Sequence, residues 1–294
     1  MSTNSYTKRF GDRKEGRQVR NCPAELRLTP YLMRRRSDAC CSYADTVEVG
    51  QIARWLMQKR QEGFRTMGLL HLTASAYVRT VAAFPAVNRF VAGRRLYARN
   101  DIELVLSVRR GQSAEAAHTP VKIFCSPNDT VFDVYSRINE AVDEIQAGTG
   151  ETRLTKFAAS LIRAPRFLLR WITALFRLMD YFDWFPRSRL DDSPFHGSIA
   201  IGNMGLLGIQ PVTHHICDFG TLPCFLSIGT QRKQREVEAD GSVVERRYVD
   251  YRFTCDERIA DVAVLADALK YFRHLLTHPA LLELPPERVE DDVN

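Results

Sequence analysis

The sequence lacks the patterns that mark several classes of protein. Its seven cysteines include no Cys-x-x-Cys pair, so we expect no metal site of the structural zinc type. No apolar run approaches the roughly 20 residues of a membrane span, and the polar N-terminus has no apolar core of a secretory signal. An odd number of cysteines without framework spacing favours thiols over disulfides. We therefore expect a cytoplasmic protein.

Positive charge is concentrated at one end of the chain. The 294 residues carry a net charge of +6. Residues 1–36 hold ten Lys and Arg against three Asp and Glu, a local +7, and the other 258 residues hold 31 basic and 32 acidic groups. Because the body is close to neutral, we expect no binding of nucleic acid.

Hydrophobic periodicity and turn signals indicate one domain between two charged ends. We expect a basic flexible arm over residues 1–26, a folded domain over 27–282 and a mobile acidic tail over 283–294. Helices and strands interleave, which is typical of an α/β or α+β fold. Helices are expected over 25–36, 50–61, 69–84, 131–146 and 259–276, and strands over 41–49, 95–98, 102–108, 121–124, 198–201, 224–228, 233–238 and 243–253.

Residues 153–185 combine a narrow basic stripe with a wide apolar arc, and Pro165 predicts a break between two helices. Basic side chains recur at seven-residue intervals, at Lys156, Arg163, Arg170 and Arg177. One interpretation is a helix packed on the core or on a neighbouring subunit, with one solvated edge. The other is an amphipathic helix at a membrane surface, which would make the protein peripheral at the membrane.

Three motifs resemble those of one protein family. Residues 256–262 (DERIADV), followed by a helix and Pro279, resemble the family motif D-H-R-x-x-D-G. Residues 197–205 (GSIAIGNMG) resemble its G-T-F-T-I-S-N-L-G segment, and residues 84–88 (FPAVN) resemble a P-x-x-N segment after a long helix. Over about residues 27–282, the chain resembles the catalytic domain of the 2-oxoacid dehydrogenase acyltransferases, which is related to chloramphenicol acetyltransferase.

The resemblance implies an α/β two-layer sandwich with a chloramphenicol acetyltransferase-like mixed sheet flanked by helices. It also implies a homotrimer with active sites at the subunit interfaces. In this family a His is the general base toward the thiol of CoA or dihydrolipoamide, and a Ser or Thr stabilises the oxyanion. An acyl-CoA would then be a substrate and no cofactor would be bound permanently. Since the sequence shows no lipoyl domain, a lipoyl group would come from a protein partner in trans.

The chain departs from the family at the positions that carry the chemistry. Glu257 stands in the place of the catalytic His, and Gly202 in that of the oxyanion Ser. Arg258 and Asp261 match the family motif, in which these two residues form structural contacts. Proton transfer from a thiol to an ordinary Glu is uphill by about 4 pKa units, roughly 6 kcal/mol, against roughly 3 kcal/mol for His. Burial of a carboxylate raises its pKa and can thereby reduce the free energy of this proton transfer. Glu257 is thus a candidate base, and the alternative is an ion pair with Arg258 or Arg252.

His214 and His215 are the candidate substitutes for the missing His. Adjacent residues of a strand point to opposite faces, so at most one of them would face a site; packing or surface roles are the alternative. Gly202 and Asn203 would form the oxyanion region. We predict CoA-dependent acyl transfer with altered chemistry. The alternative is a catalytically silent trimeric scaffold or partner subunit, a pseudoenzyme, with a membrane surface as a further candidate partner.

Overall fold

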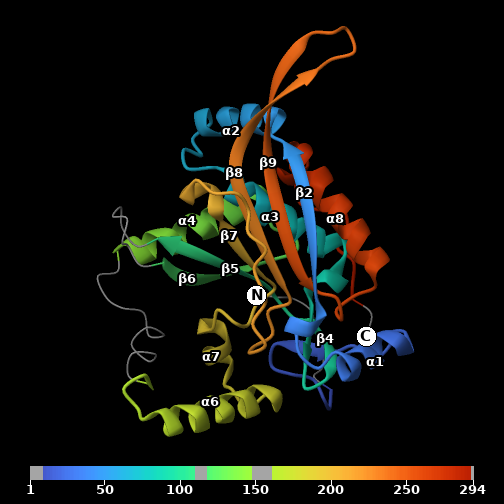
Figure 1. The fold of residues 1–294 in the computed structure, drawn as a ribbon, viewed down its shortest axis with the longest axis vertical. Helices are drawn as coiled ribbons and strands as arrows, with labels where there is room; N and C mark the ends of the chain where they lie inside the picture. Colours follow the sequence, from blue (N-terminus) through green and yellow to red (C-terminus); the bar gives the residue numbers. More distant parts are fainter. Residues whose placement is uncertain (1–8, 110–117, 148–160, 293–294) are drawn as a thin grey trace.

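The structure is a computed structural model that describes residues 9–109, 118–147 and 161–292 (Figure 1). Its main sheet has six strands in the order β2-β9-β8-β7-β5-β6. β7 is parallel to both β5 and β8, and the other neighbours are antiparallel, so the expected mixed sheet is confirmed. The strands are β2 (Cys40–Glu48), β5 (Ile102–Arg109), β6 (His118–Cys125), β7 (Ile199–Asn203), β8 (Cys224–Val237) and β9 (Val243–Asp256).

Four helices and one face of the main sheet enclose the core (Figure 1). Alternation along β8 turns Leu226 and Ile228 toward the helices, where both are buried, and turns Phe225 to the opposite face, which we call the outer face. Tyr251 of β9 is fully buried in the same core. The helices are α2 (Gly50–Gln61), α3 (Leu69–Ala83), α4 (Val131–Ala147) and α8 (Val262–Thr277).

A small second sheet takes up part of the expected arm. It has the order β1-β4-β3, with β1 (Gly16–Gln18), β3 (Arg89–Ala92) and β4 (Arg95–Arg99). Glu15 is buried, and its carboxylate lies 3.2 Å from Arg99 Nη1. The prediction of a flexible arm is therefore wrong for residues 9–26, because their charged side chains pair inside the fold; residues 1–8 lie outside the described chain.

The remaining helices lie between and around the two sheets. α6 (Arg166–Tyr181) begins after Pro165, as expected, and the preceding residues 153–160 of the striped segment lie outside the described ranges. Figure 1 shows α6 and α7 at the end of the molecule opposite the tip of the β8–β9 hairpin. The other elements are α1 (Ala24–Leu32), α7 (Arg187–Asp192) and the 3₁₀ helices η1 (Ser37–Ala39), η2 (Pro85–Asn88), η3 (Met204–Leu207) and η4 (Pro279–Leu282).

The C-terminal tail lies against the body. Glu283 accepts a hydrogen bond of 2.7 Å from Trp55 Nε1, and the amide of Glu290 donates to the carbonyl of Ala82 at 2.8 Å. The carboxylate of Asp292 pairs with the guanidinium of Arg89. The expectation of a mobile tail is therefore wrong for residues 283–292, since ion pairs and a backbone hydrogen bond hold them.

Candidate functional site

The motif at residues 256–261 is built around a buried carboxylate. Arg258 donates to both oxygens of Asp256, at 2.7 Å from Nε and 2.7 Å from Nη2. Arg36 Nε lies 3.5 Å from the same carboxylate, and all three side chains are buried. Two arginines thus neutralise one buried carboxylate, the arrangement that such a group requires.

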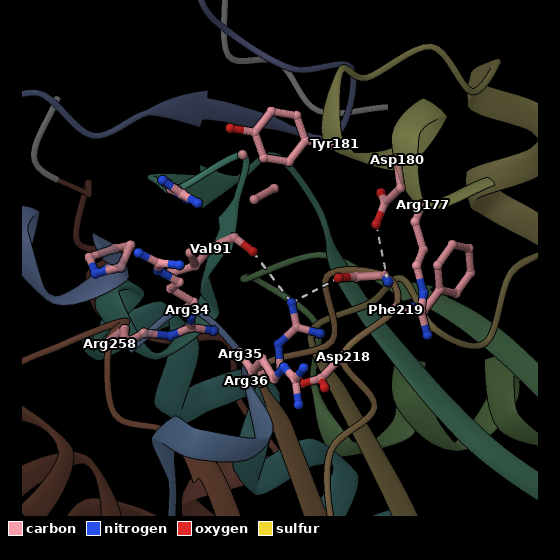
Figure 2. Close-up of a pocket in the computed structure, with 15 residues that line it drawn as sticks. Arg34, Arg35, Arg36, Val91, Arg177, Asp180, Tyr181, Asp218, Phe219 and Arg258 are labelled. Atoms are coloured by element: carbon pink, nitrogen blue, oxygen red, sulfur yellow. Dashed lines mark hydrogen bonds between the residues drawn. The ribbon is translucent and has the colours of Figure 1, made fainter. Parts of the chain in front are cut away.

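The two arginines also connect the motif to distant segments. Arg36 donates to the carbonyls of Cys217, at 2.7 Å, and Gly220, at 2.8 Å, and the second contact is drawn in Figure 2. Arg258 Nη1 donates to the carbonyl of Met33 at 2.8 Å. These contacts give Arg258 a structural role and fix the end of α1 beside the motif.

Asp261 is the N-cap of α8. Its side chain accepts a hydrogen bond of 2.8 Å from the amide of Ala263, and its φ and ψ are extended. α8 therefore begins at Val262, three residues after the predicted start at Ile259. The carboxylate of Asp261 is committed to the helix end.

Glu257 differs from its neighbours because its carboxylate is not committed. The side chain is half-buried, and only its backbone amide has a hydrogen bond of known geometry, to the carbonyl of Ala39 at 2.9 Å. The alternative, an ion pair with Arg258 or Arg252, is not formed: Arg258 binds Asp256 instead, and no ion pair joins Glu257 to Arg252 in the described chain. Among the residues that the structure describes, no side chain forms a hydrogen bond or ion pair with the Glu257 carboxylate.

Glu257 lines a cavity of about 760 Å³ that we call the motif pocket. Its walls are mainly apolar and come from α1, from the segment before β3 and from the start of α8. Its apolar lining includes Leu26, Met33, Phe84, Pro85, Ala260, Val262 and Val264. The lining also includes Glu25, Asp261, Glu290, Asp291 and Asp292, with Arg89 as the basic member. The pocket thus combines apolar walls with several carboxylates, of which that of Glu257 is uncommitted.

Three cysteines lie beside the motif on neighbouring strands. Cys41 of β2 and Cys224 of β8 both lie opposite Cys255 of β9, and the sulfurs of Cys224 and Cys255 are 3.3 Å apart. Burial, with smaller contributions from Cys255 and the Glu257 carboxylate, raises the pKa of Cys41 to about 11. Since the thiolate is the nucleophile, Cys41 is a poor one near neutral pH.

The two candidate histidines lie on a loop before β8, not on a strand. Their rings stack with centroids 4.9 Å apart, and His214 also stacks on Phe225 at 4.4 Å. The prediction that they point to opposite faces is wrong, because the loop carries both onto the outer face of the sheet. Among the described residues, neither contacts Glu257, and neither lines the motif pocket.

The expected oxyanion region lies next to these histidines. Gly202 is buried in β7, and a Cβ added there would lie 2.8 Å from Met204 Cε and 3.2 Å from Phe225 Cζ. A serine at this position would require the neighbours to move. Phe225 therefore brings Gly202 and His214 together on the outer face, whereas Glu257 lies elsewhere in the same subunit.

Sequence analysis missed the residues that close the site. The sequence assigns no role to Asp256 of the motif, to Phe225 or to the tail residues Glu290 and Asp292. A carboxylate beside an Arg in a motif is a signal that could have suggested the Asp256 pair. The contacts of Phe225 and of the tail depend on tertiary structure, and no local pattern encodes them.

The family model for the 2-oxoacid dehydrogenases acyltransferase (catalytic domain) matches residues 189–284, which include two of the three motifs. No curated protein sequence matches the chain. None of the described helices is both long enough and apolar enough to cross a membrane. Within the described ranges, no group of three or more His, Cys, Asp or Glu is placed to hold a metal ion.

Solved acyltransferase structures share the fold of nearly the whole chain. A probable dihydrolipoamide acetyltransferase from Listeria monocytogenes has a TM-score of 0.56 at 12% identity, with 90% of this chain and 95% of that chain covered. The cubic core of the pyruvate dehydrogenase multienzyme complex gives 0.57 at 11%, covering 91% and 95%. Chloramphenicol acetyltransferase gives 0.52 at 11%, covering 89% and 99%. The resemblance to this acyltransferase family and its fold is confirmed.

Proposed function

We propose that the protein transfers an acyl group between CoA and a thiol, with Glu257 as general base in the motif pocket. One observation carries the proposal. Within the motif Asp256, Arg258 and Asp261 are committed to structural contacts, and Glu257 directs an uncommitted carboxylate into an apolar-walled cavity. A general base must be free to accept a proton, and a carboxylate without a hydrogen-bond or ion-pair partner meets that requirement.

The step balances with the groups named. The Glu257 carboxylate takes the proton of the acceptor thiol, and the sulfur attacks the carbonyl carbon of the acyl-CoA thioester. The tetrahedral intermediate collapses, the bond from this carbon to the CoA sulfur breaks, and the proton passes from Glu257 to the departing CoA thiolate. The apolar walls at Leu26, Phe84 and Val264 would hold the acyl chain.

We further propose a homotrimer in which the outer face of one subunit meets the motif pocket of the next. This arrangement would bring His214 or His215 to Glu257 although one subunit keeps them apart. A neighbour in fold is the cubic core of a multienzyme complex, which supports an oligomer. A lipoyl-bearing protein partner would supply the acceptor thiol in trans. Seven free thiols support a reducing cytoplasm.

Chromatographic measurement of free CoA and of the acylated acceptor, with acyl-CoAs of increasing chain length as donors and dihydrolipoamide as acceptor, tests the chemistry. We expect Glu257→Gln to lower kcat/KM by about 10²–10⁴, the usual contribution of a general base. His214→Ala and His215→Ala test the histidines separately. Glu25→Gln, in the lining of the same pocket, is the matched control and should retain activity.

The alternative is a catalytically silent scaffold, and Gly202 favours it because this residue has no hydroxyl that could stabilise an oxyanion. A stable trimer by light scattering that releases no thiol from any donor would contradict acyl transfer and support the silent trimer. Activity that persists unchanged in Glu257→Gln would reject Glu257 as the base.

A further inference from the structure

Helix α6 presents three different faces. Leu169, Ile172, Phe176 and Met179 are half-buried, whereas Arg166, Arg170 and Arg177 are exposed together on another side. Between these faces lies a row of exposed large apolar side chains, which we call the α6 apolar face. It consists of Phe167 (68% exposed), Leu168, Trp171 (74% exposed), Leu175 and Leu178.

The α6 apolar face is larger than the packing of the helix requires. No residue of α6 is fully buried. The exposed apolar surface continues before the helix at Ile162 and after it at Phe182 and Trp184, whose rings stack at 5.2 Å. A contiguous exposed apolar surface of this kind marks an interaction site.

The C-terminal end of α6 is anchored to the body. The Asp180 carboxylate lies 3.1 Å from His196 Nε2 and accepts a hydrogen bond of 3.1 Å from the amide of Gly220, while Arg13 donates to the Asp180 carbonyl at 2.7 Å. Burial alone would raise the pKa of Asp180, but His196 and Arg13 hold it below its ordinary value. This anchored end fixes how the apolar face is presented.

A cavity of about 500 Å³ lies beside this anchored end (Figure 2). We call it the arginine pocket, because Arg34, Arg35, Arg36, Arg94, Arg177 and Arg258 line it. Arg36 and Arg258 are committed to Asp256. The two lining carboxylates are also engaged: Asp180 anchors α6, and Asp218 accepts from the amide of Ser37 at 2.9 Å. The other four arginines form no ion pair within 4.0 Å in the described part of the chain, although the charge of Arg35 acts on the Asp218 carboxylate.

The position of Arg94 supports a role for its side chain. Gly93 (φ 54°) and Arg94 (φ 60°) form the turn between β3 and β4, where both central residues have positive φ. Asn and Gly are favoured in such turns, and a residue that carries a Cβ atom is strained there. The Arg94 guanidinium lies 6.0 Å from the centre of the Tyr31 ring, at the edge of the pocket. A strained Arg beside three other unpaired ones indicates a site for an anion.

We propose that this end of the molecule docks on an anionic phospholipid bilayer. The α6 apolar face would lie among the acyl chains at the interface, and the arginine pocket would take a phosphate headgroup. Arg177 and Tyr181 belong to α6 and also line the pocket, so the two features are continuous. A 16-residue helix is about 24 Å long, which suits a helix lying in the interface plane.

Charge decides between a membrane and a second copy of the chain. Residues 161–179 contain four arginines and no Asp or Glu. The same residues of a second copy would offer these arginines no acidic partner, whereas an anionic bilayer attracts each of them by about 1 kcal/mol, close to a fivefold gain in affinity. Exposed tryptophan beside arginine is also typical of an interfacial helix.

Flotation of the full-length protein with vesicles tests the proposal. We expect binding to phosphatidylcholine–phosphatidylglycerol vesicles (7:3), weaker binding at high salt, and little binding to pure phosphatidylcholine. Trp171→Ser with Leu175→Ser should abolish flotation. Arg94→Glu with Arg177→Glu should weaken binding at least tenfold. The matched control, Arg235→Glu with Lys270→Glu, reverses two exposed charges far from α6 and should bind like the wild type.

Tryptophan fluorescence reports insertion directly. Brominated phosphatidylcholine in anionic vesicles should quench the wild type but quench Trp171→Phe with Trp184→Phe clearly less, since the remaining Trp55 is held by Glu283 inside the body. Absence of flotation, or equal quenching of the two proteins, overturns the proposal. A dimer in solution that Trp171→Ser with Leu175→Ser dissociates, without flotation, assigns the face to a second copy. Glu257→Gln should float normally, so failure of the acyl-transfer proposal leaves this result intact.

Discussion

Burial lowers the pKa of His71 to about 4, and the charge of Arg60 adds to the effect. The ring lies in the first turn of α3, where Nδ1 accepts a hydrogen bond of 3.2 Å from the amide of Gly68. An imidazole in the unfolded chain has a pKa near 6.5. The folded protein therefore holds His71 neutral over a pH range in which the unfolded chain binds a proton.

We expect His71 to make the protein acid-sensitive. Because its pKa is lower in the folded state, its neutral form contributes fully above pH 6.5, and stability falls as the pH drops toward 4. Between pH 7 and 4.5 the loss from this group is about 2–3 kcal/mol. His71→Asn keeps an acceptor for Gly68 but does not titrate. Urea unfolding at both pH values should show a smaller loss in the variant, and equal losses would contradict the expectation.

Asp261 links the sequence motif to an element, because it caps α8. Removing the N-cap acceptor leaves a helix amide unsatisfied, so Asp261→Ala should lower the free energy of unfolding by about 1 kcal/mol. Asp261→Ser should restore most of this, since Ser also caps helices. Thermal unfolding by circular dichroism measures both. Equal losses for Ala and Ser would show that the carboxylate acts through another contact.

Elements with strong local signals were predictable from the sequence. The helix expected over 69–84 is α3, and the turn between the expected strands 233–238 and 243–253 joins β8 and β9, with Gly241 at φ +83°. Both signals are local: a continuous apolar helix before Pro85, and a turn that needs positive φ. The fold class and family followed from motifs, which are local as well.

Elements set by tertiary pairing were not predictable. β1 has only three residues. It is held in place by its pairing with β4 and by the ion pair between Glu15 and Arg99. The motif places Glu257 correctly in the sequence. Its pairing with Arg258 does not occur, because Arg258 pairs with Asp256, and the sequence does not distinguish between these two neighbouring carboxylates. His214 and His215 lie on a loop, where the side chains do not alternate between two faces as they do on a strand. The expectation that the two rings point to opposite faces therefore does not apply.

At the scale of the whole molecule, the tail connects regions far apart in sequence. Lys59, which is buried, pairs with Glu283 at 2.8 Å, and Arg89 pairs with Asp292. The same tail borders the motif pocket. The tail thus satisfies two buried cations and closes one side of the candidate site.

Truncation after Leu282 should destabilise the protein. It leaves Arg89 without the Asp292 carboxylate and Lys59 with Glu62 alone, and losing a partner from a buried pair costs about 3–5 kcal/mol. Calorimetry should show a clear drop in Tm. Truncation after Asp292 removes only two residues and is the control. An unchanged Tm in the shorter protein would contradict a structural role for the tail.

Strand β9 is flanked unevenly along its length. Residues 248–256 have β2 on one side and β8 on the other, whereas residues 243–247 pair in the sheets with β8 alone. Exposing residues 248–256 requires breaking the hydrogen bonds to both neighbouring strands and disrupting the core. Exposing residues 243–247 requires only that the tip of the β8–β9 hairpin opens. One continuous strand therefore has two lifetimes: its inner amides exchange hydrogen only when much of the sheet unfolds, and its outer amides exchange through local opening.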